Sequence, residues 1–341
     1  MKLLEKIQNG GVYTIAEMSA NHAGKLENAY AIIKAAKEAG ADCLKIQTYT
    51  ADTLTLNCDN EYFQIHGGLW DGHTFYTLYQ DACTPWEWQG AIKEACEKEG
   101  MDFLSTPFDF TAVDFLESLN VEMYKIASPE LNDIPLIEYV ASKGKPMLIS
   151  TGMAAEEEIR DAVEACRRQG NDQVILLKCT SEYPAKFEDM NLSLIPDMME
   201  RFGVPVGLSD HSMGHLAPVV AVTMGACVIE KHFCLDRTIK NPDSEFSMEP
   251  AEFAAMVENV NLAKASLGKA NYGLAKGEST SIRRSLFASR DIKAGEAFTK
   301  DNVRSVRPAY GLPPVRYYEV LKRKAACDIP FGTPLKEEHL G

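Results

Sequence analysis

Two stretches of this chain decide its fold: Val204-Pro205-Val206-Gly207-Leu208-Ser209-Asp210-His211 and Ala226-Cys227-Val228-Ile229-Glu230-Lys231-His232. Each begins as a short apolar run that is typical of a buried strand, and each ends in charged and imidazole side chains. A strand that ends in this way carries its reactive groups from the core to the rim. His211 and His232, each beside a carboxylate, therefore predict an open metal site at neighbouring strand ends.

Six further strand-like runs end in reactive groups, at residues 12–17, 43–47, 103–106, 123–128, 147–151 and 174–181. Helical periodicity separates them, at residues 26–39, 86–99, 112–119, 134–143, 155–168, 216–224 and 250–267. Apolar strands that alternate with helices predict parallel strands covered by helices. Eight such units predict a (β/α)8 TIM barrel, an α/β fold whose active site lies at the C-terminal ends of the strands. A doubly wound open sheet is the alternative, but no Gly-x-Gly-x-x-Gly follows the first run.

The composition limits the classes of partner. A formal net charge of −14 argues against nucleic acid or an anionic membrane surface as the main partner. We find no secretory signal and no apolar run long enough to span a bilayer, so no membrane association is expected. The nine cysteines are scattered and form no Cys-x-x-Cys pair, which indicates reduced thiols in a cytoplasmic protein.

Changes in composition and periodicity along the sequence predict two domains. The barrel is expected over residues 1–267, and residues 268–282, rich in Gly, Ser, Lys and Ala, are expected to form a linker. Residues 283–341 contain three short strand-like runs, at 285–289, 303–306 and 324–329, separated by turn residues. This segment is too small to extend the barrel, so a separate β-rich domain is predicted.

Basic and hydroxyl side chains recur at the predicted strand ends. The lysines are Lys45, Lys125 and Lys231, and the hydroxyls belong to Ser105, Thr106, Ser128, Ser150, Thr151, Ser181 and Ser209. Ammonium and hydroxyl donors from several strands are what a phosphate or a phosphorylated carboxylate requires. For any single lysine, a solvated surface position is the alternative.

Motifs along the whole chain resemble those of the sialic acid synthase family, whose members condense phosphoenolpyruvate with an amino sugar. They include Ile15-Ala16-Glu17, Lys45-Ile46-Gln47-Thr48, Ser105-Thr106-Pro107-Phe108, Tyr124-Lys125-Ile126-Ala127-Ser128, Ile149-Ser150-Thr151-Gly152-Met153, Gly207-Leu208-Ser209-Asp210-His211 and Glu230-Lys231-His232-Phe233. The tail is similar to the antifreeze-like, or SAF, domain of these enzymes, a β-clip fold. The resemblance implies an enzyme, a phosphoenolpyruvate-dependent transferase that forms a C–C bond.

Within this family the motifs most resemble those of the pseudaminic acid synthases. The segments concerned are Glu17-Met18-Ser19-Ala20-Asn21-His22, Gly67-Gly68-Leu69-Trp70-Asp71-Gly72, Thr84-Pro85-Trp86-Glu87-Trp88 and Arg307-Pro308. The second substrate would then be a 6-deoxy diacetamido hexose, and phosphate would leave by C–O cleavage. Aromatic residues after the second strand could line a pocket for its methyl and acetamido groups: Tyr62, Phe63, Trp70, Phe75, Tyr76 and Tyr79.

The resemblance also implies roles for individual residues. Phosphoenolpyruvate would be bound by Lys45, Thr106, Lys125, Ser128, Ser150, Ser181 and Ser209. The sugar would be bound by Gln47, Glu130, Tyr183, Asp243 and, from the partner subunit, the residue matching Arg307. Catalysis would involve Glu17, His211 and His232, with the two histidines holding a divalent metal, Mn²⁺ or alternatively Mg²⁺ or Co²⁺. Asp210 and Glu230 are candidates for orienting the imidazoles, with structural ion pairs as the alternative.

The resemblance further implies a homodimer in which the SAF domain of one subunit covers the barrel mouth of the other. Three other functions stay open from the sequence. They are a sialic or legionaminic acid synthase, a Schiff-base pyruvate aldolase that uses Lys125 or Lys231 as nucleophile, and a non-catalytic carbohydrate-binding protein.

Overall fold

The structure is a computed structural model that describes residues 2–341, and it divides into two compact units, residues up to 268 and residues 269–341. Eight parallel strands form a closed barrel in the first unit, with β1 paired to both β2 and β8. The strands are β1 (Tyr13–Glu17), β2 (Cys43–Thr48), β3 (Asp102–Pro107), β4 (Tyr124–Ile126), β5 (Met147–Ser150), β6 (Val174–Cys179), β7 (Val206–Asp210) and β8 (Val228–His232). The predicted TIM barrel is confirmed.

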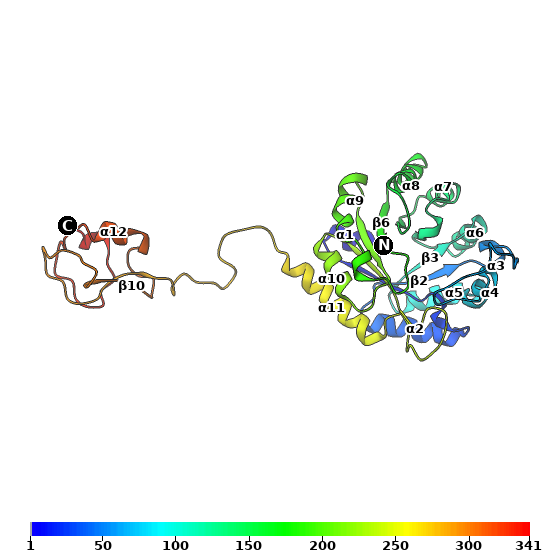
Figure 1. The fold of residues 1–341 in the computed structure, drawn as a ribbon, viewed down its shortest axis with the longest axis horizontal. Helices are drawn as coiled ribbons and strands as arrows, with labels where there is room; N and C mark the ends of the chain where they lie inside the picture. Colours follow the sequence, from blue (N-terminus) through cyan, green and yellow to red (C-terminus); the bar gives the residue numbers. More distant parts are fainter. Residues whose placement is uncertain (1) are drawn as a thin grey trace. The chain divides into compact units, whose positions relative to one another are not determined.

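Helices surround the strands, as Figure 1 shows for the first unit. They are α1 (Lys2–Gln8), α2 (Leu26–Glu38), α3 (Ala51–Leu54), α4 (Phe75–Ala82), α5 (Trp86–Lys98), α6 (Phe110–Ser118), α7 (Ile134–Ala141), α8 (Glu156–Arg168), α9 (Leu194–Phe202), α10 (Leu216–Thr223) and α11 (Pro250–Ser266). Short 3-10 turns follow three of the strands: η1 (Ser19–His22), η2 (Ser128–Glu130) and η3 (Phe187–Asp189).

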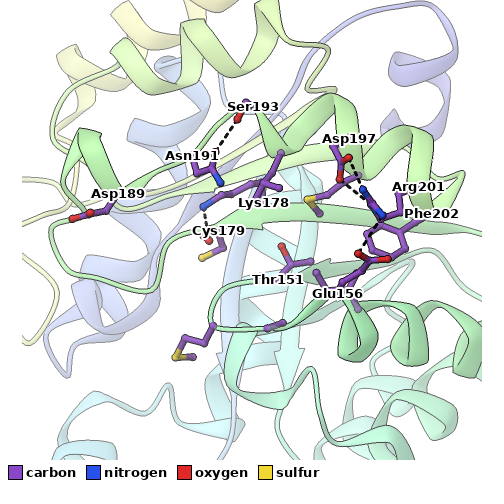
Figure 2. Close-up of a pocket in the computed structure, with 15 residues that line it drawn as sticks. Thr151, Glu156, Lys178, Cys179, Asp189, Asn191, Ser193, Asp197, Arg201 and Phe202 are labelled. Carbon is purple, nitrogen blue, oxygen red and sulfur yellow. Dashed lines mark hydrogen bonds and ion pairs between the residues drawn. The ribbon is translucent and has the colours of Figure 1, made fainter.

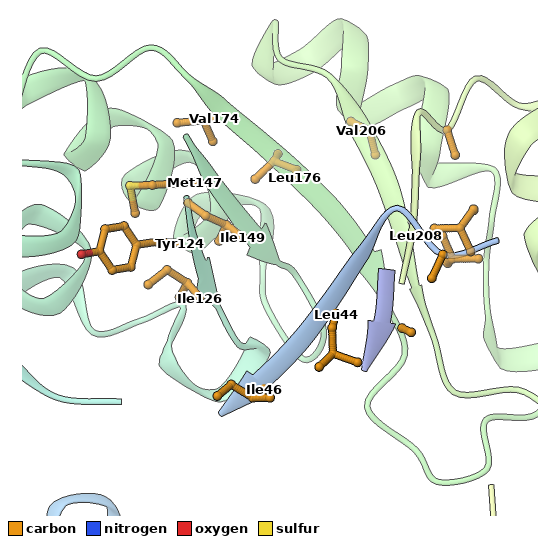
Figure 3. Packing of buried hydrophobic residues seen from close by; sticks show 14 of the residues in the cluster. Leu44, Ile46, Tyr124, Ile126, Met147, Ile149, Val174, Leu176, Val206 and Leu208 are labelled. Carbon is orange, nitrogen blue, oxygen red and sulfur yellow. The ribbon is translucent and has the colours of Figure 1, made fainter. Parts of the chain in front are cut away.

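The strands bury apolar side chains on both faces, as parallel strands in a barrel must. Side chains on the outer face pack against the helices, and Figure 3 shows part of this layer, with Leu44, Tyr124, Ile149 and Leu208 among its members. Alternate residues point inward and fill the lower barrel: Tyr13, Ile15, Cys43, Leu104, Met123, Leu148, Ile175, Leu177 and Val228. Leu3 of α1 joins this inner cluster. The upper barrel is therefore left to polar side chains.

The second unit has its own core. Strands β9 (Ser285–Ala288) and β10 (Val303–Val306) pair antiparallel, and buried residues such as Phe298, Ile329 and Leu335 pack beside them. The predicted third run, 324–329, makes only isolated bridges, for example Ile292 with Ile329. Short helical turns complete this unit: η4 (Pro314–Arg316), α12 (Tyr317–Val320) and η5 (Glu337–His339). Across residues 2–341, no helix has the length and apolar character needed to cross a membrane.

Candidate active site

Four ionisable side chains form the centre of the polar layer in the upper barrel. The ammonium nitrogen of Lys45 lies 3.1 Å from Glu17 and 3.3 Å from Glu230, and that of Lys125 lies 3.4 Å from Glu230. All four groups are buried. Burial opposes the charge of Glu230, but Lys125 and Lys45 hold its pKa down, at about 2. Two ammonium groups thus share this ionised carboxylate, so the centre can attract a further anion.

Hydroxyl groups line the same layer. Thr106 and Ser150 are buried and their hydroxyl oxygens have no hydrogen-bond partner. Ser209 donates to Glu230 at 3.2 Å. Buried polar groups are normally hydrogen-bonded, so hydroxyls left free at one place indicate that a bound molecule completes their bonding.

Gly152 lets two more hydroxyls approach this layer. A Cβ atom at this position would lie 2.3 Å from the hydroxyl oxygen of Ser181 and 2.8 Å from that of Ser128. The amide of Gly152 also donates to the Ser128 hydroxyl at 3.0 Å. The absence of a side chain at Gly152 is therefore required for the close packing of Ser128 and Ser181 in this part of the site.

The imidazoles of His211 and His232 face each other, with ring centroids 5.4 Å apart. Nδ1 of His211 lies 2.9 Å from the carbonyl oxygen of Thr180, which selects the tautomer with a lone pair on Nε2. Nδ1 of His232 is buried without a hydrogen-bond partner. Burial, followed by the positive charges nearby, lowers the pKa of His232 well below its usual value, so this imidazole is neutral.

Neutral imidazoles with free lone pairs are the form that binds a divalent metal. Residues 2–341 contain no group of three His, Cys, Asp or Glu side chains placed to hold a metal ion. A metal held by these imidazoles alone would take its other ligands from water and substrate.

Above this layer, a cavity of 440 Å³ opens at the barrel mouth. Its polar lining includes Gln47, Glu130, Asp243 and Tyr183, together with His232. Gln47 donates to Glu17 at 3.0 Å, and the amide of Ala20 donates to Asp243 at 3.2 Å. The structure therefore brings the sugar-binding residues predicted in the barrel to one pocket, directly beside the two imidazoles.

Much of the apolar lining comes from the connection between β2 and α5. Trp70, Phe75 and Tyr79 line the cavity, and Trp70 packs against Tyr183 with ring centroids 5.8 Å apart. The other aromatic residues considered for this role, Tyr62, Phe63 and Tyr76, do not line it. The indole nitrogen of Trp70 donates to the carbonyl of Pro242 at 3.2 Å, which fixes the connection over the barrel mouth.

The alternation of β7 and β8 corrects one prediction. Lys231 does not join Lys45 and Lys125: it points to the outer face, where its ammonium lies 2.6 Å from Asp210. Asp210 is therefore half of a structural ion pair and does not orient an imidazole. Glu230 pairs with the two lysines instead of a histidine. Lys231 is also unable to serve as a Schiff-base nucleophile for a substrate inside the barrel.

Glu230 takes the ion-pair role that the sequence analysis gave as the alternative to orienting an imidazole, and the sequence held a signal for its direction. Residues two apart on a strand share a face, so Glu230 had to point inward with His232. Cys179 reaches the site in the same way, with its sulfur 3.9 Å from Nδ1 of His211. Arg307 is exposed on the second unit.

The buried carboxyl of Glu130 lowers the free energy of unfolding when it ionises, and this effect can be measured. Burial raises its pKa to about 7, and its Oε2 atom has no hydrogen-bond partner. Because the unfolded carboxyl titrates near about 4.3, the raised value lowers stability progressively as the pH rises towards about 7. We expect Glu130→Gln to stabilise the protein by about 3 kcal/mol at pH 8 and by clearly less at pH 5.5.

Thermal melts of both proteins at the two pH values test this expectation. Glu122→Gln, at an exposed position just before β4, is the matched control and should leave the Tm unchanged at both pH values. A gain for Glu130→Gln that is equal at both pH values would contradict the assignment of this carboxyl as the titrating group.

Comparison with known proteins identifies the family. The NeuB family profile matches residues 32–272. The chain belongs to the NeuB family. The SAF domain profile matches residues 283–341. The family consists of the phosphoenolpyruvate-condensing synthases that the motifs indicated, so the predicted family and enzyme class are confirmed.

Individual members of the NeuB family match over nearly the whole chain. A pseudaminic acid synthase of Campylobacter jejuni is 51% identical over 96% of both chains. An N,N'-diacetyllegionaminic acid synthase of Legionella pneumophila is 36% identical over 96% of this chain and 94% of its own. The crystal structure of an N-acetylneuraminic acid synthetase of Leptospira borgpetersenii is similar, with a TM-score of 0.70 at 33% identity, covering 77% of this chain and 87% of that one.

Proposed function

We propose that this enzyme condenses phosphoenolpyruvate with 2,4-diacetamido-2,4,6-trideoxy-β-L-altropyranose and water to give pseudaminic acid and phosphate. The 51% identity to a pseudaminic acid synthase, spread over 96% of both chains, carries the choice of substrate. The identity to the legionaminic acid synthase is 36% over a similar length. The geometry of the site supports the reaction itself.

Phosphoenolpyruvate is placed in the upper barrel by charge and by free donors. Lys45 and Lys125 supply two ammonium groups, and Thr106 and Ser150 supply hydroxyls that lack any other partner. Ser128, Ser181 and Ser209 border the same layer. Charge-assisted hydrogen bonds of this kind are stronger than neutral ones, so they can repay the burial of a multiply charged anion.

The reaction forms one C–C bond and breaks one C–O bond. C3 of phosphoenolpyruvate attacks the aldehyde carbon of the open-chain sugar, and water adds to C2. The tetrahedral centre at C2 then collapses. The bond between C2 and the bridging oxygen breaks, the O–P bond stays intact, and phosphate leaves with the bonding electrons. Glu17 is the candidate for holding a proton during these steps, because burial raises its pKa and it lies 3.1 Å from Lys45.

His211 and His232 are proposed to hold a divalent metal, with Mn²⁺ as the first choice and Mg²⁺ or Co²⁺ as alternatives. Such an ion would supply Lewis-acid polarisation of the aldehyde oxygen. The protein contributes two imidazoles at the boundary between the polar layer and the sugar cavity, and that of His232 is neutral. Their position next to Asp243 and Tyr183 supports a sugar orientation in which the aldehyde end lies beside the polar layer.

The cavity at the barrel mouth suits a 6-deoxy diacetamido sugar. Trp70, Phe75 and Tyr79 offer apolar surface to a methyl and to acetamido methyls, and Glu130 and Asp243 accept hydrogen bonds from hydroxyl or amide groups. Its lining contains no arginine or lysine from any described residue. A cationic donor for the acetamido oxygens would therefore have to come from outside this lining.

We propose that the donor is Arg307 of a second subunit in a homodimer. Residues 269–284, the part of the second unit that precedes β9, are all exposed, as a linker would be. Arg307 is also exposed, and guanidinium forms bidentate hydrogen bonds to oxygen acceptors. We place the enzyme in the cytoplasm, because all nine cysteines are free thiols.

Product formation with separate sugars tests the substrate. Purified enzyme receives phosphoenolpyruvate with the altrose-configured sugar or with the precursor of sialic or legionaminic acid. We expect kcat/KM for phosphate release to favour the altrose-configured sugar by about 100-fold or more, because a site built for particular polar groups rejects analogues that leave them unpaired. Faster turnover of either other sugar would move the assignment to that synthase.

Borohydride trapping distinguishes the proposed synthase reaction from that of a Schiff-base aldolase. The pKa of Lys125 is lowered by burial, so this residue is the one lysine of the site to consider as a Schiff-base nucleophile. No covalent adduct is expected after borohydride treatment in the presence of pyruvate. An adduct on Lys125 would contradict the synthase assignment and identify the enzyme as a Schiff-base aldolase.

A further inference from the structure

A second cavity, of 710 Å³, lies outside the barrel wall. It is lined by the connection that follows β5, by β6, by the segment that leads into α9, and by the helices α8 and α9, and Figure 2 shows its lining. Its volume falls in the range of small-molecule sites. None of the proposed reaction chemistry uses this cavity.

Lys178 forms the deepest charged group of this lining. It is 6% exposed and projects from β6 on the side opposite to Leu177 and Cys179. Its ammonium donates to the carbonyl of Cys179 at 3.0 Å and to the hydroxyl of Thr180 at 2.8 Å. An ammonium group has three donors, so one remains for a further acceptor.

The charge of Lys178 lacks a counter-ion. Four lysines are buried among residues 2–341, and Lys45, Lys125 and Lys231 each lie within 4.0 Å of a carboxylate. Lys178 makes no such ion pair in the described part of the chain. Burial lowers the pKa of Lys178, and a bound anion beside it would stabilise the charged ammonium.

The carboxylates around the cavity are occupied or directed elsewhere. Arg201 lies 2.9 Å from Asp197 and 3.2 Å from Glu156, which engages both acidic groups. The carboxylate of Asp189 points away from Lys178 in Figure 2. The protein itself therefore does not neutralise the ammonium.

Asn191 supplies a second donor. Its side-chain oxygen accepts from the Ser193 hydroxyl at 2.7 Å, which leaves its amide hydrogens free. Asn191 and Lys178 both line the cavity, and Figure 2 shows the ends of their side chains directed toward each other. Two donors that face each other leave room for an acceptor that both can share.

We propose that this cavity binds a small molecule through a phosphate or carboxylate group held by Lys178 and Asn191. The polar groups farther out, Ser193 and Asp189, suit a ligand body that carries hydroxyls. The site is independent of the sugar assigned to the reaction. Its acidic rim disfavours a highly charged polyanion.

Occupancy of this site reaches the reaction centre through two residues of β6 and its extension. Lys178 donates to the hydroxyl of Thr180, and the carbonyl of Thr180 accepts from Nδ1 of His211 at 2.9 Å. An anion that accepts a hydrogen bond from the Lys178 ammonium changes the hydrogen bonding of Thr180, the residue that orients His211. The ligand therefore acts as a modulator of turnover.

Thermal melts with defined probes test the binding. The probes are inorganic phosphate, gluconate as a hydroxylated carboxylate, and glucose as the neutral control. The variants are Lys178→Met and, as a matched control, Lys186→Met, which removes an exposed lysine whose side chain is 63% exposed. At tenfold excess over Kd, we expect the wild-type Tm to rise by about 3 °C more than that of Lys178→Met.

Binding of either anion in the active site occurs in all variants, so the difference between variants reports the outer cavity. The Lys186→Met shift should equal that of the wild type, and glucose should shift none of the proteins. A difference with phosphate alone or gluconate alone identifies the head group. Equal shifts in wild type and Lys178→Met with both anions would overturn the proposal.

Asn191→Gly provides a second variant that should fold without strain. Asn191 has a φ of 43°, a left-handed conformation that glycine adopts readily. This variant should lose part of the anion-dependent shift, and the dependence of kcat on gluconate should weaken in both variants. The proposed site would be contradicted if Asn191→Gly and Lys178→Met both kept the wild-type Tm shift with anion and the wild-type dependence of kcat on gluconate.

Discussion

Replacement of His232 by Ala is expected to lower kcat/KM for phosphate release by about 1,000-fold or more, because a bound metal contributes several kcal/mol to polarising the aldehyde. The side chain is the last of β8 and is 12% exposed, so its removal opens no cavity in the apolar core. The variant should therefore melt close to the wild type. Phosphate release, thermal melting and the metal content of the purified protein are the three measurements.

His215→Ala is the matched control. This histidine follows His211 by four residues, yet it lies at the start of α10 and its Nε2 is 3.4 Å from the amide of Asn259. It should keep its metal content and most of its activity. If His232→Ala remained fully active in the presence of chelator, the metal would have no part in the reaction.

The architecture could be predicted because its signals are local. An apolar run such as residues 147–150 is buried on both faces, which only a parallel strand between helix layers and a filled interior allows. The helices between strands carry the 3.6-residue period that covers such a sheet. Together these features leave few alternatives to a barrel.

The polar centre could be predicted only in part, because a strand end shows which residues are near the rim without showing which face they occupy. Lys231 and Glu230 are adjacent in sequence, yet one pairs with Asp210 behind the wall and the other with Lys45 and Lys125 inside it. Strict alternation from His232 would have assigned both correctly.

The lining of the sugar cavity could not be read from composition. Trp70 and Tyr62 lie in the same connection after β2, and both are aromatic. Only Trp70 packs against Tyr183, whereas Tyr62 is 78% exposed. The path of a long connection depends on tertiary contacts such as the bond from Trp70 to Pro242, which no local pattern announces.

Mixing two inactive variants is expected to restore activity if Arg307 acts across subunits. His211→Ala removes a proposed metal ligand, and Arg307→Ala removes the proposed donor to the sugar. In a dimer that combines one subunit of each kind, one barrel keeps both histidines and meets an intact Arg307 from its partner. Random exchange of equal amounts should then recover about a quarter of the wild-type activity, because half of the dimers are mixed and each has one complete site.

Subunit exchange is verified with two affinity tags, so that mixed dimers are isolated and assayed directly. Lys336→Ala, at an exposed position of the same domain, replaces Arg307→Ala in the control mixture. That mixture reports the activity of a mixed dimer with every arginine intact. If purified mixed dimers of His211→Ala and Arg307→Ala stay as inactive as the parent variants, Arg307 serves its own barrel or none, and the trans arrangement fails. If Arg307→Ala alone keeps full activity with an unchanged KM for the sugar, the acetamido donor lies elsewhere, because loss of a bidentate guanidinium contact cannot leave sugar binding intact.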